Sequence, residues 1–403
     1  MVKQPTGSCG LAVGNGEMEF KIFCSNKDMD GSIIKGVAFD EWVPYNANTN
    51  IWYSSTNIIL PVLKQEIKKE KPDYLFIVGI YDWQYNFKPL LFCKGIKKII
   101  SVRGMLHPGA LSQKGFKKKI YLGLWKMLGL HKGKAVGSGQ RAVGSGQLAV
   151  GKGQRAVGSW QWATVFHATD EAEKNYIQQV FGNSVNVNIA ANFPNVLELQ
   201  PVVQKEPGQL NLISIALISP MKNMLLVLEA LGEGSREEGG GRRESGVGRR
   251  ESLVGLITYN IYGPIKDRHY WEACEAQIKK LPHHITVNYH GDLRPDKIVD
   301  ALAANHVFIL PSKSENYGHA IYEALSAGRP VITSHTTPWN NLQTAKAGIN
   351  VSLTDKTEMV NAIERFAAMK PEELETWSKG ARVYAVGAVD VEEIRRQYEE
   401  MFG

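Results

Sequence analysis

The chain has 403 residues, of which 43% are hydrophobic and 22% charged, and a net charge of +7 at pH 7. This length predicts two or three domains, and the composition is that of a globular protein, which excludes disordered and fibrous classes. No apolar run reaches the roughly 18–20 residues of a membrane span, and the chain starts without a secretory pattern, so we expect a cytoplasmic protein. Four widely spaced cysteines without a CxxC pair predict free thiols and neither a disulfide framework nor a zinc site.

Two tandem seven-residue repeats hold most of the positive charge. Units of the type AVGSGQR run over 135–162, and the segment 131–162 that contains them carries +5. The segment 234–252, which contains the GRRES units of the repeat segment 232–254, adds +1, which leaves +1 for the rest of the chain. Their glycines oppose a coiled coil, so we expect disordered surface insertions. A nucleic-acid-binding or membrane-binding arm is the alternative. The repeats lack aromatic stacking platforms, so we expect no nucleic-acid partner. Residues 10–16 (GLAVGNG) echo the same repeat, so we expect residues 1–18 to form an atypical extension.

Strand-like and helix-like segments alternate between the repeats, as is typical of parallel α/β domains. In the N-terminal half we expect strands at 20–25, 74–79, 98–102, 163–168 and 185–190, and helices at 61–70, 113–130 and 171–180. In the C-terminal half we expect strands at 210–216, 255–262, 285–289, 307–310 and 330–333, and helices at 222–231, 270–280, 295–304 and 319–327. Prolines and polar residues at 192–204 mark a linker. The fold class is therefore α/β, with two Rossmann-like domains facing across a cleft.

The segment 310–337 carries most of the chemistry. A strand ends at Pro311, a polar loop follows, and a helix begins near His319 and stops before Gly328. The free N–H groups and positive dipole of its first turn favour an anion such as a diphosphate. Glu315 and Glu323 are about 12 Å apart if the segment is fully helical, which exceeds the roughly 5–9.5 Å of glycosidase pairs. Recognition of hydroxyls at two points fits better, and a helix cap plus a solvated carboxylate is the alternative.

The residues ENYGHAIYE followed by ALSAGRPVI resemble the E-x7-E signature of family 4 glycosyltransferases, which are retaining GT-B enzymes that use nucleotide-sugars. LISPMKN (217–223) resembles the lysine loop of that family, and IYGP (261–264) and YHGDL (289–293) resemble its glycine turns. RGMLHPGALSQK (103–114) and FHATDEAE (166–173) are similar to N-terminal segments of the bacterial polysaccharide and lipopolysaccharide-type members. Outside the repeats and the first twenty residues, the resemblance covers nearly the whole chain.

This resemblance implies a role for each matching residue. Lys222 and Glu315 would be the catalytic pair: Lys222 neutralises the donor diphosphate and Glu315 holds a hydroxyl of the donor sugar. Glu323 would accept hydrogen bonds from the ribose. The other implied donor-binding residues are Ser219, Asn223, Gly263, Gly291, Asp292, Leu293, Asn316, Tyr317, Gly318 and His319. On the acceptor side the implied residues are Arg103, Gly104, His107 and His167. The family generally needs no metal or other cofactor, so none is expected.

The domain plan follows from the same resemblance. We expect the extension at 1–18, an acceptor-side domain at 19–200, a nucleotide-sugar-binding domain at 201–385, and a helix at 386–403 that packs back on the N-terminal domain. The lysine-rich helix 113–130 either lies on an anionic membrane surface or is an ordinary amphipathic helix with its apolar stripe in the core. The first reading would place the protein peripherally on the inner face of the cytoplasmic membrane.

The expected function is transfer of a sugar, with retention, from a nucleotide-sugar to a glycan or lipid-linked acceptor in cell-surface polysaccharide synthesis. Two departures favour an alternative, a truncated and non-catalytic remnant that binds ligand without turnover. Leu217 stands where the family usually has an arginine. The opening strand and glycine-rich loop of the family also have no counterpart. The recognisable part begins near Glu19.

Overall fold

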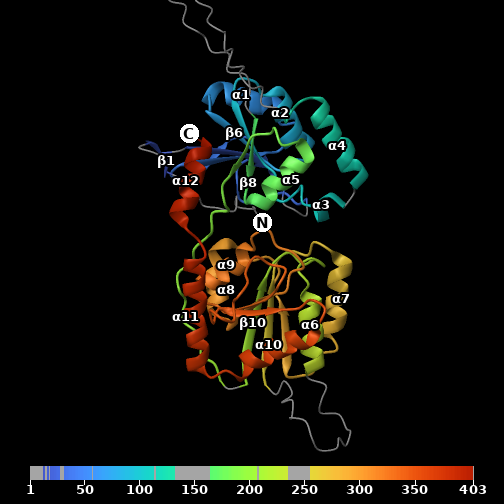
Figure 1. Ribbon diagram of the computed structural model, residues 1–403, viewed down its shortest axis with the longest axis vertical. Coiled ribbons are helices and arrows are strands. Elements are labelled where there is room, and N and C mark those ends of the chain that lie inside the picture. The colour runs from blue at the N-terminus through green and yellow to red at the C-terminus, as the bar shows by residue number, and fades with distance from the viewer. Residues whose placement is uncertain are drawn as a thin grey trace, which may run out of the picture. The chain divides into compact units, whose positions relative to one another are not determined.

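The computed structural model describes residues 12–13, 16–17, 19–27, 31–56, 58–112, 115–131, 164–206, 208–234 and 255–402. Both repeat segments and most of the expected extension lie outside these residues. The chain divides into two compact units (Figure 1): the C-terminal unit is Phe193–Val391, and the N-terminal unit runs to Asn192 and includes Glu392–Gly403. A short antiparallel pair, β1 (Ala12–Val13) and β2 (Gly16–Glu17), precedes the first longer strand.

Besides the β1–β2 pair, the N-terminal unit contains two separate sheets. The strands are β3 (Phe20–Ser25), β4 (Trp42–Asn46), β5 (Thr49–Ser54), β6 (Tyr74–Val78), β7 (Lys97–Ser101), β8 (Thr164–Ala168) and β9 (Val187–Ile189). The order in one sheet is β3-β5-β4, with β4 antiparallel, and the order in the other is β6-β7-β8-β9, all parallel. The helices are α1 (Leu60–Glu70), the π-helical turn η1 (Trp83–Phe87), α2 (Lys88–Phe92), α3 (Pro108–Ser112), α4 (Gly115–Met127), α5 (Glu171–Phe181) and α12 (Val391–Phe402).

Apolar side chains from the second sheet and its helices form the core of this unit. Trp125 of α4 and Phe166 of β8 are completely buried, and the Phe181 ring of α5 lies 5.1 Å from that of Phe166. The α12 helix joins the same unit: the Tyr398 ring lies 5.6 Å from His167, and the Tyr74 hydroxyl donates to the Phe402 carbonyl. The last helix of the chain is therefore part of the N-terminal unit.

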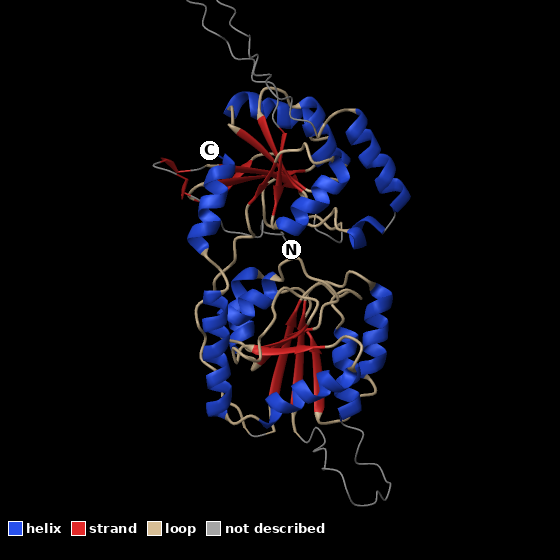
Figure 2. Cartoon of the chain, viewed as in Figure 1, coloured by secondary structure: helices blue, strands red, loops and turns tan. Residues whose placement is uncertain are grey.

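The C-terminal unit has one continuous parallel sheet with helices on both faces (Figure 2). Its strands are β10 (Leu210–Ile215), β11 (Ile257–Tyr262), β12 (Ile285–Tyr289), β13 (Val307–Leu310), β14 (Val331–Ser334) and β15 (Gly348–Val351), in the order β12-β11-β10-β13-β14-β15. Its helices are α6 (Met224–Gly234), α7 (Arg268–Ile278), the 3-10 turn η2 (Pro295–Lys297), α8 (Ile298–Ala303), α9 (His319–Ser326), α10 (Lys356–Ala368) and α11 (Pro371–Gly387).

The order of these strands fixes the place of a ligand site. The chain adds strands in one direction from β10 to β12 and then in the other direction from β13 to β15. Parallel sheets bind ligands beyond the carboxyl ends of the strands at the point where this direction reverses. In this unit that point lies between β10 and β13, so the loops after these two strands are the ones to inspect.

Several local structures differ from the sequence-based expectations, among them β15, α10 and α11, which were not expected. The helix expected from Lys222 begins only at Met224, because Asn223 has a positive φ of 59° that a helix does not accept. Lys222 therefore lies in the loop after β10. The hairpin of β4 and β5 was not predicted, since its central residues YNANTN read as a polar loop. Among the helices of the described residues, none is both long and apolar enough to cross a membrane.

Candidate donor-binding site

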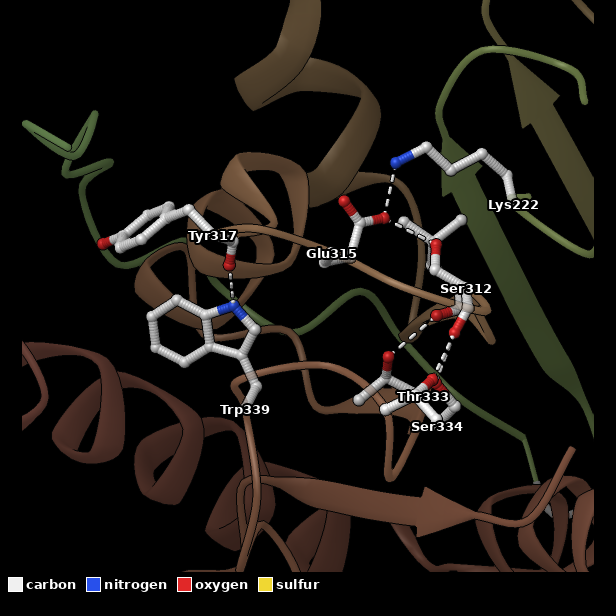
Figure 3. Close-up of polar contacts among 9 residues, drawn as sticks. Lys222, Ser312, Glu315, Tyr317, Thr333, Ser334 and Trp339 are labelled. Carbon is white, nitrogen blue, oxygen red and sulfur yellow. Dashed lines mark hydrogen bonds and ion pairs between the residues drawn. The ribbon is translucent and has the colours of Figure 1, made fainter. Parts of the chain in front are cut away.

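Lys222 and Glu315 meet at the reversal point of the C-terminal sheet. Lys222 comes from the loop after β10 and Glu315 from the loop after β13, and Lys222 Nζ lies 2.5 Å from Glu315 Oε1 (Figure 3). The side chains are 22% and 10% exposed, so solvent reaches the ammonium more than the carboxylate. The expected catalytic residues thus form an ion pair across the two loops that border the reversal point.

Further hydrogen bonds hold Glu315 in place. Ser312 Oγ donates to Glu315 Oε1 at 2.6 Å, so this oxygen accepts from two groups at once. The Ser312 carbonyl in turn accepts from the hydroxyls of Ser334, the last residue of β14, and of Thr336 in the loop that follows. Figure 3 shows this chain of contacts running from Lys222 to Ser334. The Glu315 loop is therefore anchored to both neighbouring loops before any ligand arrives.

The lysine loop is also fixed by its own backbone. The Ser219 carbonyl accepts from the Lys222 amide at 3.0 Å, which closes a tight turn, and Asn223 follows with its positive φ. The Met221 carbonyl accepts from the Lys313 amide at 2.8 Å, which joins the loop after β10 to the loop after β13. Backbone bonds, as well as the ion pair, thus set the distance between Lys222 and Glu315.

Gly263 and Gly291 follow β11 and β12 and touch one another. The Gly263 amide donates to the Gly291 carbonyl at 2.7 Å. Gly263 has φ +129°, and a Cβ there would lie 2.0 Å from the Ala216 carbonyl oxygen, so only glycine fits. Gly291 has φ +71° but open space around it. Asp292 is exposed beside these turns, and Leu293 packs against the buried cluster around α9.

Gly318 begins α9 with φ +79°, a conformation that turns the chain sharply from loop to helix. The turn is supported by Trp339, whose Nε1 donates to the Tyr317 carbonyl at 2.6 Å. The rings of Tyr317 and His319 are tilted by 46° with centroids 4.8 Å apart, and Figure 3 shows the Tyr317 ring directed away from Glu315. Asn316 lies in the same loop. The first amide groups of α9 are consequently presented at the carboxyl end of β13.

Glu323 occupies the second turn of α9 and takes a different partner from Glu315. Its Oε1 accepts from Asn195 Nδ2 at 3.1 Å. Burial raises the pKa of this carboxyl above its usual value, and the Asn195 hydrogen bond partly opposes that rise. In the structure, therefore, the two carboxylates do not act as a pair: Glu315 is bound to Lys222 and Glu323 to Asn195.

On the N-terminal unit, the turn after β7 holds two of the expected acceptor-side residues. Arg103 has φ +51°, and its Nη1 donates to Asn192 Oδ1 at 2.6 Å. The Gly104 amide donates to the buried carboxylate of Glu173, which also accepts from the Thr169 amide at 2.7 Å. Glu173 thus ties the Arg103 turn to the start of α5, an arrangement that sequence reasoning did not anticipate.

The two expected histidines have different environments. His107 is exposed; its Nδ1 accepts from the Gly109 amide at 3.1 Å at the start of α3. His167 is completely buried, its Nε2–H donates to the Ala190 carbonyl at 2.8 Å, and its Nδ1 accepts from the Ser101 hydroxyl at 2.9 Å. Burial lowers the pKa of His167 to about 4. With both nitrogens occupied and no exposed surface, His167 is a core residue, which corrects its expected place among acceptor-side contacts.

Sequence reasoning missed Ser312, Asn195 and Trp339. Ser312 stands three residues before Glu315, a spacing that favours a hydroxyl-to-carboxylate contact within one loop, so a signal for it existed. Asn195 and Trp339 are distant in sequence from the groups they contact, and no local pattern marks them. Across the described part of the chain, no group of three His, Cys, Asp or Glu side chains is arranged to hold a metal ion.

Comparisons with known proteins concern the fold and the C-terminal unit. Residues 197–384 match the family model of glycosyl transferases group 1. Sucrose-phosphate synthase from Thermosynechococcus elongatus is a similar structure, with 13% identity, a TM-score of 0.61, and coverage of 95% of this chain and 88% of that one. Anabaena Alr3699/HepE, solved with UDP and glucose, has 14% identity, a TM-score of 0.55, and coverage of 88% and 85%.

WaaG, a glycosyltransferase involved in lipopolysaccharide biosynthesis, is also similar, with 13% identity, a TM-score of 0.56, and coverage of 89% and 88%. No curated protein sequence matches this chain. At such identities the likeness to solved structures shows the fold, while the family model covers the C-terminal unit that carries Lys222 and Glu315. The chain thus has the GT-B fold of two Rossmann-like units, and its segment 197–384 matches the model of the group 1 glycosyl transferases.

Proposed function

We propose that this protein is a retaining family 4 glycosyltransferase, which moves a sugar from a nucleotide-sugar to a glycan or lipid-linked acceptor in cell-surface polysaccharide synthesis. The observation that carries the proposal is the ion pair of Lys222 and Glu315 at the reversal point of a group 1 domain. The UDP and glucose bound to Anabaena HepE support a nucleotide-sugar as the donor class.

The reaction needs stabilisation of a leaving diphosphate. As the bond between the anomeric carbon and the phosphate oxygen breaks, negative charge grows on the diphosphate. Lys222 and the first amides of α9 then stabilise this charge. The acceptor hydroxyl forms the new bond on the same face, and its proton passes to the departing phosphate oxygen. Glu315, held by Ser312, orients a sugar hydroxyl, and Glu323 binds the ribose through the oxygen that Asn195 leaves open.

The ion pair of Lys222 and Glu315 opens when the donor binds. A diphosphate attracts the lysine ammonium away from Glu315 Oε1, and Ser312 Oγ keeps its hydrogen bond to that oxygen. Glu315 is then released toward the sugar while still anchored. This exchange moves the ammonium from one anion to another, and Glu315 then keeps the hydrogen bond from Ser312 and gains one from the sugar hydroxyl. No metal is needed for it, because Lys222 supplies the positive charge.

On the acceptor side we assign Arg103, Gly104 and His107, which lie in one turn of the N-terminal unit. The Arg103 guanidinium has planar donors that suit an anionic acceptor such as a lipid-linked phosphate. For a lipid-linked acceptor we propose a peripheral location on the inner face of the cytoplasmic membrane.

A thermal-shift panel of UDP-, GDP-, ADP- and TDP-sugars tests the donor site. A ligand at about 100 times its dissociation constant adds roughly 2.7 kcal/mol to the folded state, which raises the melting midpoint by several degrees. We expect one base class to shift the midpoint of the wild type and not of Glu323→Ala. The matched control is Glu358→Ala on α10, outside the site. Equal shifts in wild type and Glu323→Ala would contradict the assignment.

The remnant remains the second candidate, because the sheet of the N-terminal unit is divided and Leu217 replaces a cationic residue. Both candidates bind a donor, so turnover separates them. We expect release of free nucleotide diphosphate from the shifting donor in the presence of acceptor glycolipid, and its loss in Lys222→Met. Donor binding without nucleotide release under any acceptor would favour the remnant.

A further inference from the structure

An exposed tryptophan follows the carboxyl end of β6. Trp83 begins the π-helical turn η1, and its ring stacks on the buried Phe87 ring with centroids 4.2 Å apart and 11° between the planes. The Tyr121 ring of α4 meets Trp83 edge-on, with centroids 6.5 Å apart. Trp83 is nevertheless 46% exposed. Because Phe87 covers one face of the indole, the opposite face is the one that a ligand can reach, and it is flat and apolar.

Asp82 precedes this ring and keeps one carboxylate oxygen open. Its Oδ1 accepts from the backbone amides of Gln84 at 2.8 Å and of Tyr85 at 2.6 Å, which caps η1. Its carbonyl accepts from the Tyr121 hydroxyl at 3.4 Å. The side chain is exposed, and within the described part of the chain only Oδ1 accepts hydrogen bonds. Oδ2 can therefore accept from a ligand hydroxyl beside the Trp83 ring.

The loop that carries Trp83 is joined to the Arg103 turn. β6 and β7 pair in parallel, so the two loops follow the carboxyl ends of neighbouring strands. The Tyr81 hydroxyl donates to the Met105 carbonyl at 3.4 Å, which links them. Gly79 has φ +88°, and a Cβ there would lie 3.2 Å from Met105 Cε, so the approach is close. The two loops thus form one surface where a parallel sheet binds its ligands.

The chemistry of this surface fits a sugar ring. One face of a pyranose presents C–H bonds with slight positive charge, and the face of an aromatic ring is slightly negative, so the two attract when stacked. Hydroxyl groups at the edge of the same sugar donate to a carboxylate such as that of Asp82. A lipid phosphate offers no such face, and the ionised carboxylate repels it. An apolar protein partner would bury the carboxylate without a hydrogen bond.

We propose that Trp83 and Asp82 form an acceptor subsite that binds a pyranose at the accepting end of the acceptor. The indole stacks against one face of the sugar ring, and Asp82 Oδ2 accepts from one of its hydroxyls. This assignment rests on the proposed function and narrows its acceptor class. The group presented to the N-terminal unit is a sugar, so a lipid-linked acceptor presents its sugar, and not its phosphate, to Trp83.

A saturation-transfer difference NMR titration of the full chain measures this binding directly. The probes are the methyl glycosides of glucose, galactose, mannose and N-acetylglucosamine. We expect at least one of them to bind, with the strongest saturation on the ring protons of one face. Trp83→Ala raises its dissociation constant about tenfold, and Trp83→Phe restores most of the affinity because a phenyl face also stacks. Asp82→Asn raises the dissociation constant about fivefold, since a neutral acceptor binds hydroxyls less strongly.

The matched control is Phe92→Ala, which removes another exposed ring of the same unit. Phe92 is 44% exposed and ends α2, shortly before β7 begins, at the opposite end of that strand from the Arg103 turn. We expect this variant to bind the glycoside as the wild type does. Glu315→Ala also keeps glycoside binding if Trp83 is the site, which separates this subsite from the donor sugar. Unchanged melting midpoints verify folding. If that of Trp83→Ala falls, Asp82→Asn decides, because asparagine caps a helix as well as aspartate does.

Three results would overturn the proposal: no binding of any of the four glycosides, an equal loss in Phe92→Ala, or wild-type affinity in both Trp83→Ala and Asp82→Asn. The donor-induced thermal shift reports separately on the proposed function. If only the subsite assignment is wrong, nucleotide-sugars still shift the melting midpoint of the wild type. If the proposed function is wrong, that shift is missing whether or not the glycosides bind.

Discussion

The two units of this protein differ in the continuity of their sheets. In the C-terminal unit six parallel strands pair without interruption, and every residue of β13 and β14 is buried. In the N-terminal unit the strands fall into groups of three and four. β3 is only partly buried, and β6 ends at Val78, which is 58% exposed although its sequence, YLFIV, is that of an interior strand.

β3 ends one of these sheets and β6 ends the other. Among the described residues, β3 pairs only with β5 and β6 only with β7, so each has one edge without a strand partner. The comparison teaches that a Rossmann-like unit can keep its helices and strands although its sheet is divided, with an edge at β3 and an edge at β6 that lack a strand partner among the described residues.

The largest expected effect concerns amide exchange in these strands. We expect amides of β3 and β6 to exchange at least about a thousandfold faster than those of β10 and β13, equivalent to about 4 kcal/mol, because unpaired edges open locally. Hydrogen exchange followed by mass spectrometry of peptides covering the four strands measures this. Equal protection in the two units would mean that the edges are covered.

Substitutions of Gly263 and Gly291 test how closely the backbone packs in the glycine turns of the C-terminal unit. Gly263→Ala forces its Cβ against the Ala216 carbonyl, and we expect a loss of about 3–5 kcal/mol in unfolding free energy together with loss of donor binding. Gly291→Ala has open space and positive φ, so it costs about 1–2 kcal/mol. Urea unfolding of both variants measures the difference. Comparable losses would show that backbone conformation, rather than close approach, governs these turns.

Catalysis is expected to depend on Lys222 far more than stability does. Lys222→Met removes the charge that opposes the leaving diphosphate, and we expect turnover to fall about 10²–10³-fold. Ser312→Ala removes only the anchor of Glu315, so a smaller fall in kcat with restoration in Ser312→Thr is expected. Steady-state kinetics on both variants provide the check. A Ser312→Ala effect as large as that of Lys222→Met would assign Ser312 a direct role.

The smallest expected effect is a pH dependence from Glu323. Its folded pKa lies above its usual 4.5, so the native state holds a proton more tightly than the unfolded state. Stability therefore declines as pH rises from about 4.5 through the folded pKa, and Glu323→Gln removes that decline. Urea unfolding of the wild type and of Glu323→Gln, at several pH values from about 4.5 upward, measures this change in unfolding free energy. Identical slopes would indicate that this carboxylate is solvated.

Sequence alone determined much of the protein. The alternation of strands and helices predicted the α/β class, and motif order predicted that Lys222, Glu315 and the glycine turns serve one site. These features are local: a positive φ at Gly318 or a helix start at His319 depends on neighbours in the chain. The roles of these residues stay predictions until the variants are measured.

Only the tertiary structure decided how these residues meet. It brought Lys222 within 2.5 Å of Glu315 across 93 positions, paired Glu323 with Asn195, and buried His167 between Ser101 and Ala190. It also buried Leu122 and Trp125 of α4 and left Phe116 of the same helix exposed. Such contacts join segments far apart in sequence. Strand order and packing set them, and neither quantity is encoded within a single motif.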